Sequence, residues 1–514
     1  MHLDRPLDIA PAAGTALTVP ALAALVSETA GWLHAAGLRR GDRLAIVKDN
    51  HLDMFLIAAG AAWIGALPVL VSSAIGVADI RALMSRIEPA VAVAGTGVLA
   101  KMAAAGVGLG GPDVRIVAVG EPMDLPSGAR MLDDIRGASA PPRQPVSDDE
   151  PMIVTHTSGT TGVPKLAVHS ANTTIRNAPP RLEWSRSRLP YVTPGPRDVV
   201  VAALPFAHAR SVIWVTARVV VAHRASVVIS DPAPANAAAV LEAHPPTCLE
   251  TLPNVYQRWE EIADLRPELF ARVRMFTSTF DAIHPRTIRK FMNASQARFP
   301  IWGSALGQTE TAASIATLIT RGMVRRKGGL RADAVGAGWP TFVRARAVDP
   351  ESGRKVARGK PGLLQVSTPA RCLTYLGEEE RFQAKVDGKW WNTGDMAQNL
   401  GFGRFRFLDR EVDMIPGTSG IELESILLDR LDRASEVIVL AVPDGLPVPV
   451  LCMRDNRIDP AEWRQASRGL PELAEPRLVP WEDVPRTGTW KVRRTHLRET
   501  LLGSKQGIGT GAWT

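Results

Sequence analysis

The ten-residue stretch His156–Lys165 reads H-T-S-G-T-T-G-V-P-K and combines four hydroxyl side chains, two glycines and a lysine. The apolar run Met152–Val154 precedes it, as a buried strand would. Glycine lets a backbone fold tightly and turn its N–H groups toward one point, and N–H groups, hydroxyls and an ammonium group together bind anions. The stretch is not a P-loop, because two residues separate Gly162 from Lys165. It predicts a polyphosphate-binding loop, and a polar surface turn is the alternative.

The composition limits the classes of protein that carry such a loop. The chain has 514 residues, 46% of them hydrophobic and 22% charged, which is ordinary for a globular protein of two or more domains. The net charge of +8 is spread along the chain and suits anionic small molecules, and we expect no nucleic-acid partner. Cys248, Cys372 and Cys452 lie far apart, so we expect no disulfide framework and a reducing, cytoplasmic location. The N-terminus lacks the pattern of a signal peptide.

One uncharged run, Met54–Ala78, is long enough to cross a membrane. Pro68 and three glycines interrupt it. We therefore expect a helix up to Gly65, then the strand Val69–Val71, and no membrane span. Exposed apolar area in this run would suit a dimer contact, so the chain is expected to be a monomer or a homodimer.

Apolar strand-like runs alternate with helical stretches along the first three hundred residues. A helical pattern from Leu22 to Leu33 ends near Gly37. The alternation predicts an α/β fold with mostly parallel, buried strands. The strand-like runs are Leu44–Val47, Val91–Ala94, Arg115–Val119, Met152–Thr155, Val199–Ala203, Ala225–Ile229 and Arg274–Phe276.

The sequence pattern changes after residue 330, where short β-like segments lie between turns. From residue 410 short strands mix with helices. We predict a large N-terminal domain over 1–409, with a β-rich subdomain over 330–409, and a small, mobile α+β domain over 410–514. The glycines at 106, 108 and 111 match a dinucleotide fingerprint by spacing only, because a helix-like run precedes them and a strand follows, which is the reverse of the required order.

Four further polar clusters follow the first stretch: Gly307–Glu310, Thr393–Asp395, Asp409–Arg410 and Arg486–Lys491. Each is weak alone, since a T-G-D segment is usually a turn and a buried glutamate usually belongs to an ion pair. Taken in this order with T-S-G-T-T-G-x-P-K, they resemble the adenylate-forming (ANL) superfamily of acyl-CoA synthetases, luciferases and adenylation domains. The resemblance extends over nearly the whole chain.

The resemblance implies an ATP site and a role for each cluster. Thr309 would contact the α-phosphate, and Glu310 with Thr160 would bind Mg²⁺, a cation that prefers oxygen ligands. Asp395 and Arg410 would hold the ribose, and Lys491 would bridge the substrate and the α-phosphate. Further ATP-binding residues would be Thr157, Ser158, Gly159, Thr161, Gly162, Lys165, Gly307 and Gln308.

His208, in L-P-F-A-H, matches a position that lines the acyl pocket of the family, and a satisfied core histidine is the alternative. Thr279, Phe280, Trp302 and Gly303 would complete the pocket. Thr279, Phe280 and Asp281 replace small residues of the family pattern, which favours a compact, aryl-type acid over a fatty chain; a local loop shift is the alternative.

Three other departures concern the nucleotide and the second step of the reaction. Leu306 stands where an aromatic residue usually packs on adenine. Trp490 replaces the glycine that usually precedes the adenylation lysine. The hinge segment, from Asp409 to Ser425, is short and carries Pro416 in place of a common lysine. In relatives the small domain rotates about this hinge, so the departure puts transfer to a thiol in question.

The sequence thus predicts an AMP-forming ligase that uses ATP and Mg²⁺ to activate a small, aryl-type carboxylic acid as its acyl-adenylate, with release of pyrophosphate. Transfer to a thiol, either CoA or a carrier protein, is the family default. An alternative keeps the fold and changes the second step, as in an amide ligase or in an ATP-dependent diazotase that activates nitrite for an aryl amine. A third hypothesis is a degenerate nucleotide-binding protein, against which the retention of Glu310, Asp395, Arg410 and Lys491 argues.

Overall fold

A computed structural model describes residues 1–126, 128–157, 163–177, 191–221, 223–326, 330, 334–338, 342–410, 413–415, 418–442, 445–488, 490–503 and 512–513. The chain divides into two compact units. The first contains Met1–Glu250, Gln308–Ala312 and Pro369–Ala384, and the second contains Thr251–Gly307, Ala313–Thr368 and Lys385–Thr514.

The first unit contains an eight-stranded sheet whose order is β18-β8-β7-β3-β2-β4-β5-β6. The strands from β7 to β6 run parallel, while β8 is antiparallel to both β7 and β18. These strands confirm the parallel, buried sheet that the alternating sequence pattern predicted. The bounds are β2 (Arg43–Lys48), β3 (Leu67–Ser72), β4 (Val91–Gly95), β5 (Arg115–Val119), β6 (Ala129–Met131), β7 (Ile153–His156), β8 (Leu166–His169) and β18 (Thr374–Tyr375).

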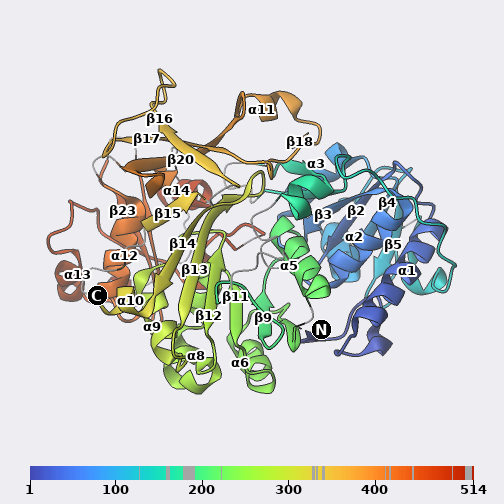
Figure 1. Cartoon of the computed structure of the whole chain (residues 1–514), viewed down its shortest axis with the longest axis horizontal. Coiled ribbons are helices and arrows are strands. Elements are labelled where there is room, and N and C mark those ends of the chain that lie inside the picture. The colour runs from blue at the N-terminus through green and yellow to red at the C-terminus, as the bar shows by residue number, and fades with distance from the viewer. Residues whose placement is uncertain are drawn as a thin grey trace. The chain divides into compact units, whose positions relative to one another are not determined.

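Four helices accompany this sheet: α1 (Val19–Ala35), α2 (Asp53–Ile64), α3 (Val77–Ile87) and α4 (Thr96–Ala104). Figure 1 shows α1 and α2 beside β2, β4 and β5 in the blue part of the chain. The uncharged run divides as predicted, because α2 ends at Gly65, whose φ of 78° is the left-handed conformation that glycine favours. Within the described part of the chain, no helix has both the length and the apolarity that a bilayer crossing requires.

A second, smaller group of strands in the first unit has the order β1-β10-β9-β11. Its members are β1 (His2–Leu3), β10 (Ala225–Val228), β9 (Val199–Ala203) and β11 (Cys248–Thr251), and α5 (Ala209–Val220) and α6 (Pro234–Ala243) connect them. β1 and β9 both run parallel to β10.

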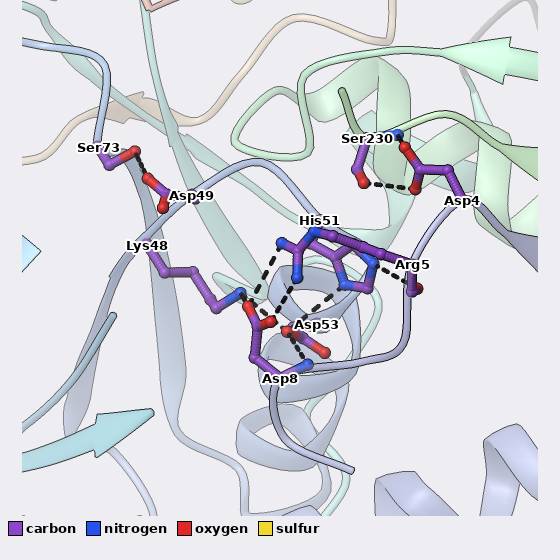
Figure 2. A network of polar contacts seen from close by, with 9 residues as sticks. All are labelled: Asp4, Arg5, Asp8, Lys48, Asp49, His51, Asp53, Ser73 and Ser230. Atoms are coloured by element: carbon purple, nitrogen blue, oxygen red, sulfur yellow. Dashed lines mark hydrogen bonds and ion pairs between the residues drawn. The ribbon is translucent and has the colours of Figure 1, made fainter. Parts of the chain in front are cut away.

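A polar network ties the N-terminal segment to this unit (Figure 2). Lys48, only 1% exposed, donates to Asp53 at 2.8 Å and to Asp8 at 2.6 Å. Asp4 accepts from both the backbone and the hydroxyl of Ser230, at 2.8 and 2.6 Å. Breaking a buried ion pair costs several kcal/mol, because it leaves one charge without its partner. The network therefore fixes the first eight residues against elements that follow much later in the sequence.

The second unit contains a sheet of mixed direction whose order is β12-β13-β14-β15-β21-β20-β17-β16. Figure 1 shows β12, β13 and β14 side by side. Four large aromatic side chains form its core: Tyr256, Phe276, Phe291 and Trp302. The strands are β12 (Met275–Thr279), β13 (Ile301–Gln308), β14 (Ala312–Thr320), β15 (Ala334–Gly338), β16 (Arg344–Val348), β17 (Pro361–Ser367), β20 (Trp390–Gly401) and β21 (Arg404–Arg410), and the helices α7 (Pro253–Arg258), α8 (Glu260–Leu265) and α9 (Pro285–Ala294) precede or separate the first two.

The last hundred residues of this unit form an α+β arrangement, as the sequence predicted. It consists of β22 (Ala434–Leu440), β23 (Val448–Met453), β25 (Arg477–Leu478), α12 (Gly420–Arg430), α13 (Pro460–Ser467) and α14 (Arg494–Gly503). Arg286 of α9 donates to the carbonyls of Leu428 and Ala434, at 2.7 and 2.8 Å. The first of these is a carbonyl of the last turn of α12, which has no partner inside the helix. The predicted boundary at residues 409–410 stays a prediction.

Candidate active site

The predicted phosphate loop joins two antiparallel strands of the first unit, β7 and β8, whose register pairs His156 with Leu166. Thr157 and Lys165 close its base, because the Thr157 N–H donates to the Lys165 carbonyl at 2.8 Å and the Lys165 N–H donates to Thr157 Oγ1 at 3.0 Å. The tip of the predicted loop lies outside the described residues; it comprises Ser158, Gly159, Thr160, Thr161 and Gly162.

His156, the first residue of this stretch, has a structural role. Its Nε2 accepts from the Ser72 N–H at 3.2 Å, and its Nδ1 lies 2.8 Å from the Thr157 carbonyl, to which it donates. Complete burial lowers the pKa of His156, so the imidazole is neutral at pH 7. The ring thus fixes the end of β7 against β3 at the point where the loop begins.

Glu310 lies at the centre of a buried cluster in the same unit. The Tyr375 hydroxyl donates to Glu310 Oε1 at 2.5 Å, and the Cys372 N–H donates to the Glu310 carbonyl at 2.7 Å. Lys165 Nζ lies 5.1 Å from the centre of the Tyr375 ring. The segments that contain Lys165, Glu310 and Tyr375, which are distant in sequence, therefore meet beside the base of the loop.

The electrostatics of this cluster leave Glu310 as an acceptor. Burial and the neighbouring Glu310 raise the pKa of Tyr375 strongly, so its hydroxyl stays protonated and donates. Burial lowers the pKa of His169 to about 4, against the opposing charge of Glu310, so His169 is neutral at pH 7.

Tyr375 uses one oxygen of Glu310, and the second oxygen can serve as a ligand for a hard cation. Among the residues that the structure describes, no group of three or more histidine, cysteine, aspartate or glutamate side chains could hold a metal ion. Mg²⁺ does not require one, because it usually keeps several waters and binds through one or two carboxylates and the phosphates of a substrate.

His208 and Thr309 meet in the first unit. His208 precedes α5, and its Nδ1 accepts from the Arg210 N–H at 3.0 Å. In the neutral ring the proton is then on Nε2, which lies 3.3 Å from Thr309 Oγ1 and donates to it. His208 is half-buried. Both ring nitrogens have partners, as the core-histidine alternative requires, and one of these partners is a predicted α-phosphate ligand. The role of His208 in the acyl pocket stays a prediction.

The second unit brings together the predicted ribose and adenylation residues. Asp395 on β20 pairs in register with Arg410 on β21, and Arg410 Nε lies 3.6 Å from Asp395 Oδ1. Asp395 is only 2% exposed. Burial raises its pKa, and the charges of Arg410 and Lys491 oppose that rise. A buried carboxylate with two cations nearby is thus available to accept hydrogen bonds from hydroxyl groups.

Thr393–Asp395, a type of segment that is usually a turn, lies within a strand in this structure. β20 continues through these residues, and its pairing with β17 shifts register between Leu363 and Gln365. Gly394 has a φ of 73°, and the Thr393 hydroxyl accepts from the Asp395 N–H at 3.1 Å. The segment is therefore a bulge within a strand, which re-aims the aspartate side chain.

Lys491 follows a tight turn that Thr487 organises. The Thr487 N–H donates to the Lys491 carbonyl at 2.8 Å, and Thr487 Oγ1 accepts from the Lys491 N–H at 3.1 Å. Trp490 occupies the turn with a φ of 63°, the left-handed conformation that glycine favours. The Trp490 ring stacks on Trp481 with centroids 5.8 Å apart, and Asn254 donates to the Trp490 carbonyl. Packing around the ring thus holds a strained backbone beside the predicted catalytic lysine.

The remaining predicted pocket residues lie at β12 and β13 of the second unit. Phe280 follows β12 with a φ of 85°, which again marks a position that favours glycine. Thr279 Oγ1 is buried and has no hydrogen-bond partner within the described part of the chain. Trp302 is completely buried and donates to Ser278 Oγ at 2.9 Å, and Gly303 pairs in register with Thr277. The contacts of Trp302 are those of a core residue, and its place in the pocket stays a prediction.

Sequence reasoning missed several charged or polar residues at these places. Tyr375 and His169 surround Glu310 but belong to no motif. Asp409, recognised only as part of an Asp-Arg pair, accepts from the Gly420 N–H at 2.9 Å, and burial raises its pKa to about 7. Arg210 binds Glu250 through two bonds of 2.6 Å. A charged residue in an otherwise apolar run, as Glu250 is in C-L-E-T-L, was the available signal.

Comparisons with known proteins agree with the motifs. A model of the AMP-binding enzyme family matches residues 4–376. The chain is 34% identical to 3-amino-2-hydroxy-4-methoxybenzoate diazotase from Streptomyces cremeus, over 99% of this chain and 94% of that protein. It is 27% identical to feruloyl-CoA synthase from an Amycolatopsis species, over 94% of each chain. Its fold is similar to that of a benzoate CoA ligase from Burkholderia xenovorans LB400, with a TM-score of 0.76 at 20% identity over 95% of each chain. The chain therefore belongs to the AMP-binding enzyme family, whose members use ATP, and the predicted α/β ligase fold and AMP-forming class are confirmed.

Proposed function

We propose that the protein is an ATP-dependent, AMP-forming enzyme that activates a small oxyanion for attack by an aryl amine, as an ATP-dependent diazotase does with nitrite. The observation that carries this proposal is the 34% identity to the Streptomyces cremeus diazotase along nearly the whole of both chains. The identity to the feruloyl-CoA synthase is 27% over a similar span. The departures at Phe280, Trp490 and the hinge segment agree with a second step that differs from thiol transfer.

The reaction is an ordinary adenylation followed by nitrosation of an amine. An oxygen of nitrite attacks the α-phosphorus of ATP, and the bond to pyrophosphate breaks. The amine nitrogen then attacks the nitrosyl nitrogen, and AMP leaves with the electron pair of the N–O bond. The amine nitrogen loses one proton, and its second proton moves to the nitrosamine oxygen to give a diazohydroxide. Protonation of that hydroxyl group and loss of water then give the diazonium ion.

In the first unit, the residues around Glu310 suit the phosphate side of this reaction. Lys165 and Thr157 would bind the terminal phosphates, and Thr309, together with Gln308, the region of the α-phosphate. Mg²⁺, held by Glu310 together with Thr160, would neutralise the charge that pyrophosphate carries as it leaves. Tyr375 donates to the same carboxylate and would keep its second oxygen directed to the metal.

In the second unit, Asp395 and Arg410 suit the ribose, since a carboxylate with two oxygens can accept from both hydroxyls. Lys491 would stabilise the charge that develops as the oxyanion attacks the α-phosphorus. Its position depends on the turn that Trp490 and Thr487 form.

Adenylation of a small aryl acid followed by transfer to a thiol is the second candidate, and it is the function that the motifs predicted. Membership of the AMP-binding family and the similarity to feruloyl-CoA synthase support it. The acceptor would be CoA or a carrier protein. A cytoplasmic location and a monomeric or homodimeric state stay predictions in either case.

One experiment separates the candidates. The protein is incubated with ATP and Mg²⁺ and either 3-aminobenzoate plus nitrite or a panel of aryl acids plus CoA, and pyrophosphate release and product mass are measured. The diazotase proposal expects pyrophosphate release that requires nitrite, and a product whose mass shows an aryl diazonium ion or its phenol. A thioester product that forms without nitrite would overturn it. Omitting Mg²⁺ tests the proposed cation.

A further inference from the structure

The peptide unit that joins Trp490 to Lys491 is held from both sides. Its carbonyl, that of Trp490, accepts from Asn254 Nδ2 at 2.5 Å. Its N–H, that of Lys491, donates to Thr487 Oγ1 at 3.1 Å, and the Thr487 N–H donates to the Lys491 carbonyl at 2.8 Å. Because a peptide unit is planar, bonds on its two sides fix the orientation of the whole unit. These bonds therefore fix the point and the direction from which the Lys491 side chain leaves the backbone.

Asn254 reaches this peptide unit from outside the turn. It lies in the first turn of α7, 236 residues before Trp490 in the sequence. Arg486, within the turn, also donates to the Trp490 carbonyl, but at 3.4 Å, and two bonds already join its guanidinium group to Glu436. Asn254 thus makes the shorter of the two bonds and connects the turn to a helix that is distant in sequence.

Stability alone explains this contact poorly. Arg258 of the same helix already packs against the turn, with its guanidinium carbon 4.5 Å from the centre of the Trp481 ring and 5.8 Å from that of Trp490. Asn254 Oδ1 is buried and has no hydrogen-bond partner among the residues that the structure describes. A buried acceptor without a partner costs at least as much as one neutral hydrogen bond contributes. An apolar side chain would therefore hold the fold equally well here, and the bond to the carbonyl calls for another explanation.

We propose that Asn254 is a positioning residue for Lys491, on which it acts through the Trp490 carbonyl. The inference rests on the proposed role of Lys491 in adenylation. A left-handed backbone at a residue other than glycine persists only where its surroundings hold it, and the Asn254 bond is one of the contacts that hold Trp490 at a φ of 63°. The lysine ammonium group ends a flexible stem of four carbons. It meets the developing charge at the α-phosphorus more often when the start of that stem is fixed, so Asn254 affects the rate of adenylation and not the binding of ATP.

The test measures kcat and the KM for ATP in nitrite-dependent pyrophosphate release with 3-aminobenzoate. N254L replaces the amide with an apolar group of similar size, so it removes the donor and the unpaired acceptor together. We expect kcat to fall by about ten- to a hundredfold, with the KM for ATP within about twofold of the wild-type value and the unfolding temperature nearly unchanged. N399L is the matched control, because Asn399 Nδ2 also donates to a backbone carbonyl, that of Val356, and N399L should retain the wild-type kcat.

A double-mutant cycle shows whether Asn254 acts through the lysine. In a K491A background, N254L is expected to change the residual rate by less than about twofold, because the group that Asn254 positions is gone. N254Q and N254M give a second comparison between side chains of equal length, of which only glutamine keeps a donor. N254Q is expected to be at least about threefold faster than N254M.

Three results would overturn the inference. The first is an N254L variant whose kcat stays within about twofold of the wild-type value. The second is a loss of rate on N254L substitution that is as large in the K491A background as in the wild type, and the third is equal rates for N254Q and N254M. A fall in the kcat of N254L that comes with a clearly lowered unfolding temperature would make Asn254 a structural residue and would overturn it as well. Wild-type protein that releases no nitrite-dependent pyrophosphate, or K491A as active as the wild type, would instead overturn the proposed function on which the inference rests.

Discussion

The substitution Tyr375→Phe tests the proposed role of Glu310 most directly. It removes the hydroxyl that donates to Glu310 Oε1 but keeps the ring beside Lys165 Nζ. A hydrogen bond to a charged group contributes about 1.5–3 kcal/mol. If the bond holds the carboxylate in position for a cation, its loss reduces activity at limiting Mg²⁺ by roughly ten- to a hundredfold. Residues that orient a metal ligand often have effects of about this size.

The assay measures pyrophosphate release against Mg²⁺ concentration, with ATP saturating. For Tyr375→Phe we expect a higher half-saturating Mg²⁺ concentration and an unfolding temperature within a few degrees of the wild-type value. Tyr256→Phe is the matched control, because Tyr256 is an equally buried tyrosine in the aromatic core of the second unit. A Tyr375→Phe variant whose Mg²⁺ dependence and rate stay within twofold of the wild type would refute the role that we assign to the hydroxyl.

Three further substitutions test other parts of the site. Lys491→Ala should reduce pyrophosphate release by about a hundredfold or more while nucleotide affinity, measured by calorimetry, changes little; equal activity would exclude the proposed role. Trp490→Gly should have a free energy of unfolding about 1 kcal/mol higher than Trp490→Ala, as measured by denaturant unfolding, because glycine adopts the left-handed backbone conformation without strain. Asp409→Asn should stabilise the protein at pH 8 by up to about 4 kcal/mol and hardly at pH 4, as measured by urea unfolding, because burial raises the pKa of Asp409 in the folded protein to about 7 from its ordinary value of 3.8. The folded wild-type protein therefore loses stability as pH rises from about 4 to 7, because Asp409 must ionise while buried. A difference in unfolding free energy between the two proteins that stays constant with pH would contradict the raised pKa of Asp409.

The fold could largely be predicted from the sequence, because the spacing of apolar residues is a local property. The run Arg115–Val119 is the strand β5 without change of bounds, and the helix expected to end near Gly65 does end there. The T-G-D segment shows the limit of this reasoning. A turn and a bulge both need Gly394, and only the pairing of β20 with β17 makes the segment a bulge.

The site was predictable only where its residues belong to motifs. Motifs mark the positions of Thr309, Glu310, Asp395 and Lys491. In the structure each of these residues has hydrogen-bonding or charged neighbours. Tyr375 is 65 residues from Glu310 in sequence, and no local pattern could connect them. The same holds for Glu250, which lies 40 residues from Arg210.

The sequence by itself predicted an anion-binding loop, because hydroxyls, glycines and a lysine beside a buried strand suit phosphate oxygens, and its motifs taken together indicated the AMP-binding family to which the chain belongs. It also marked Phe280 and Trp490 as departures, and the positive φ of each shows that these positions favour glycine. Only the tertiary structure decided which groups surround Glu310 and which glutamate orients Arg210. Burial and hydrogen bonding depend on residues that the folded chain brings together from distant parts of the sequence, and these contacts determine the charge and direction of each side chain.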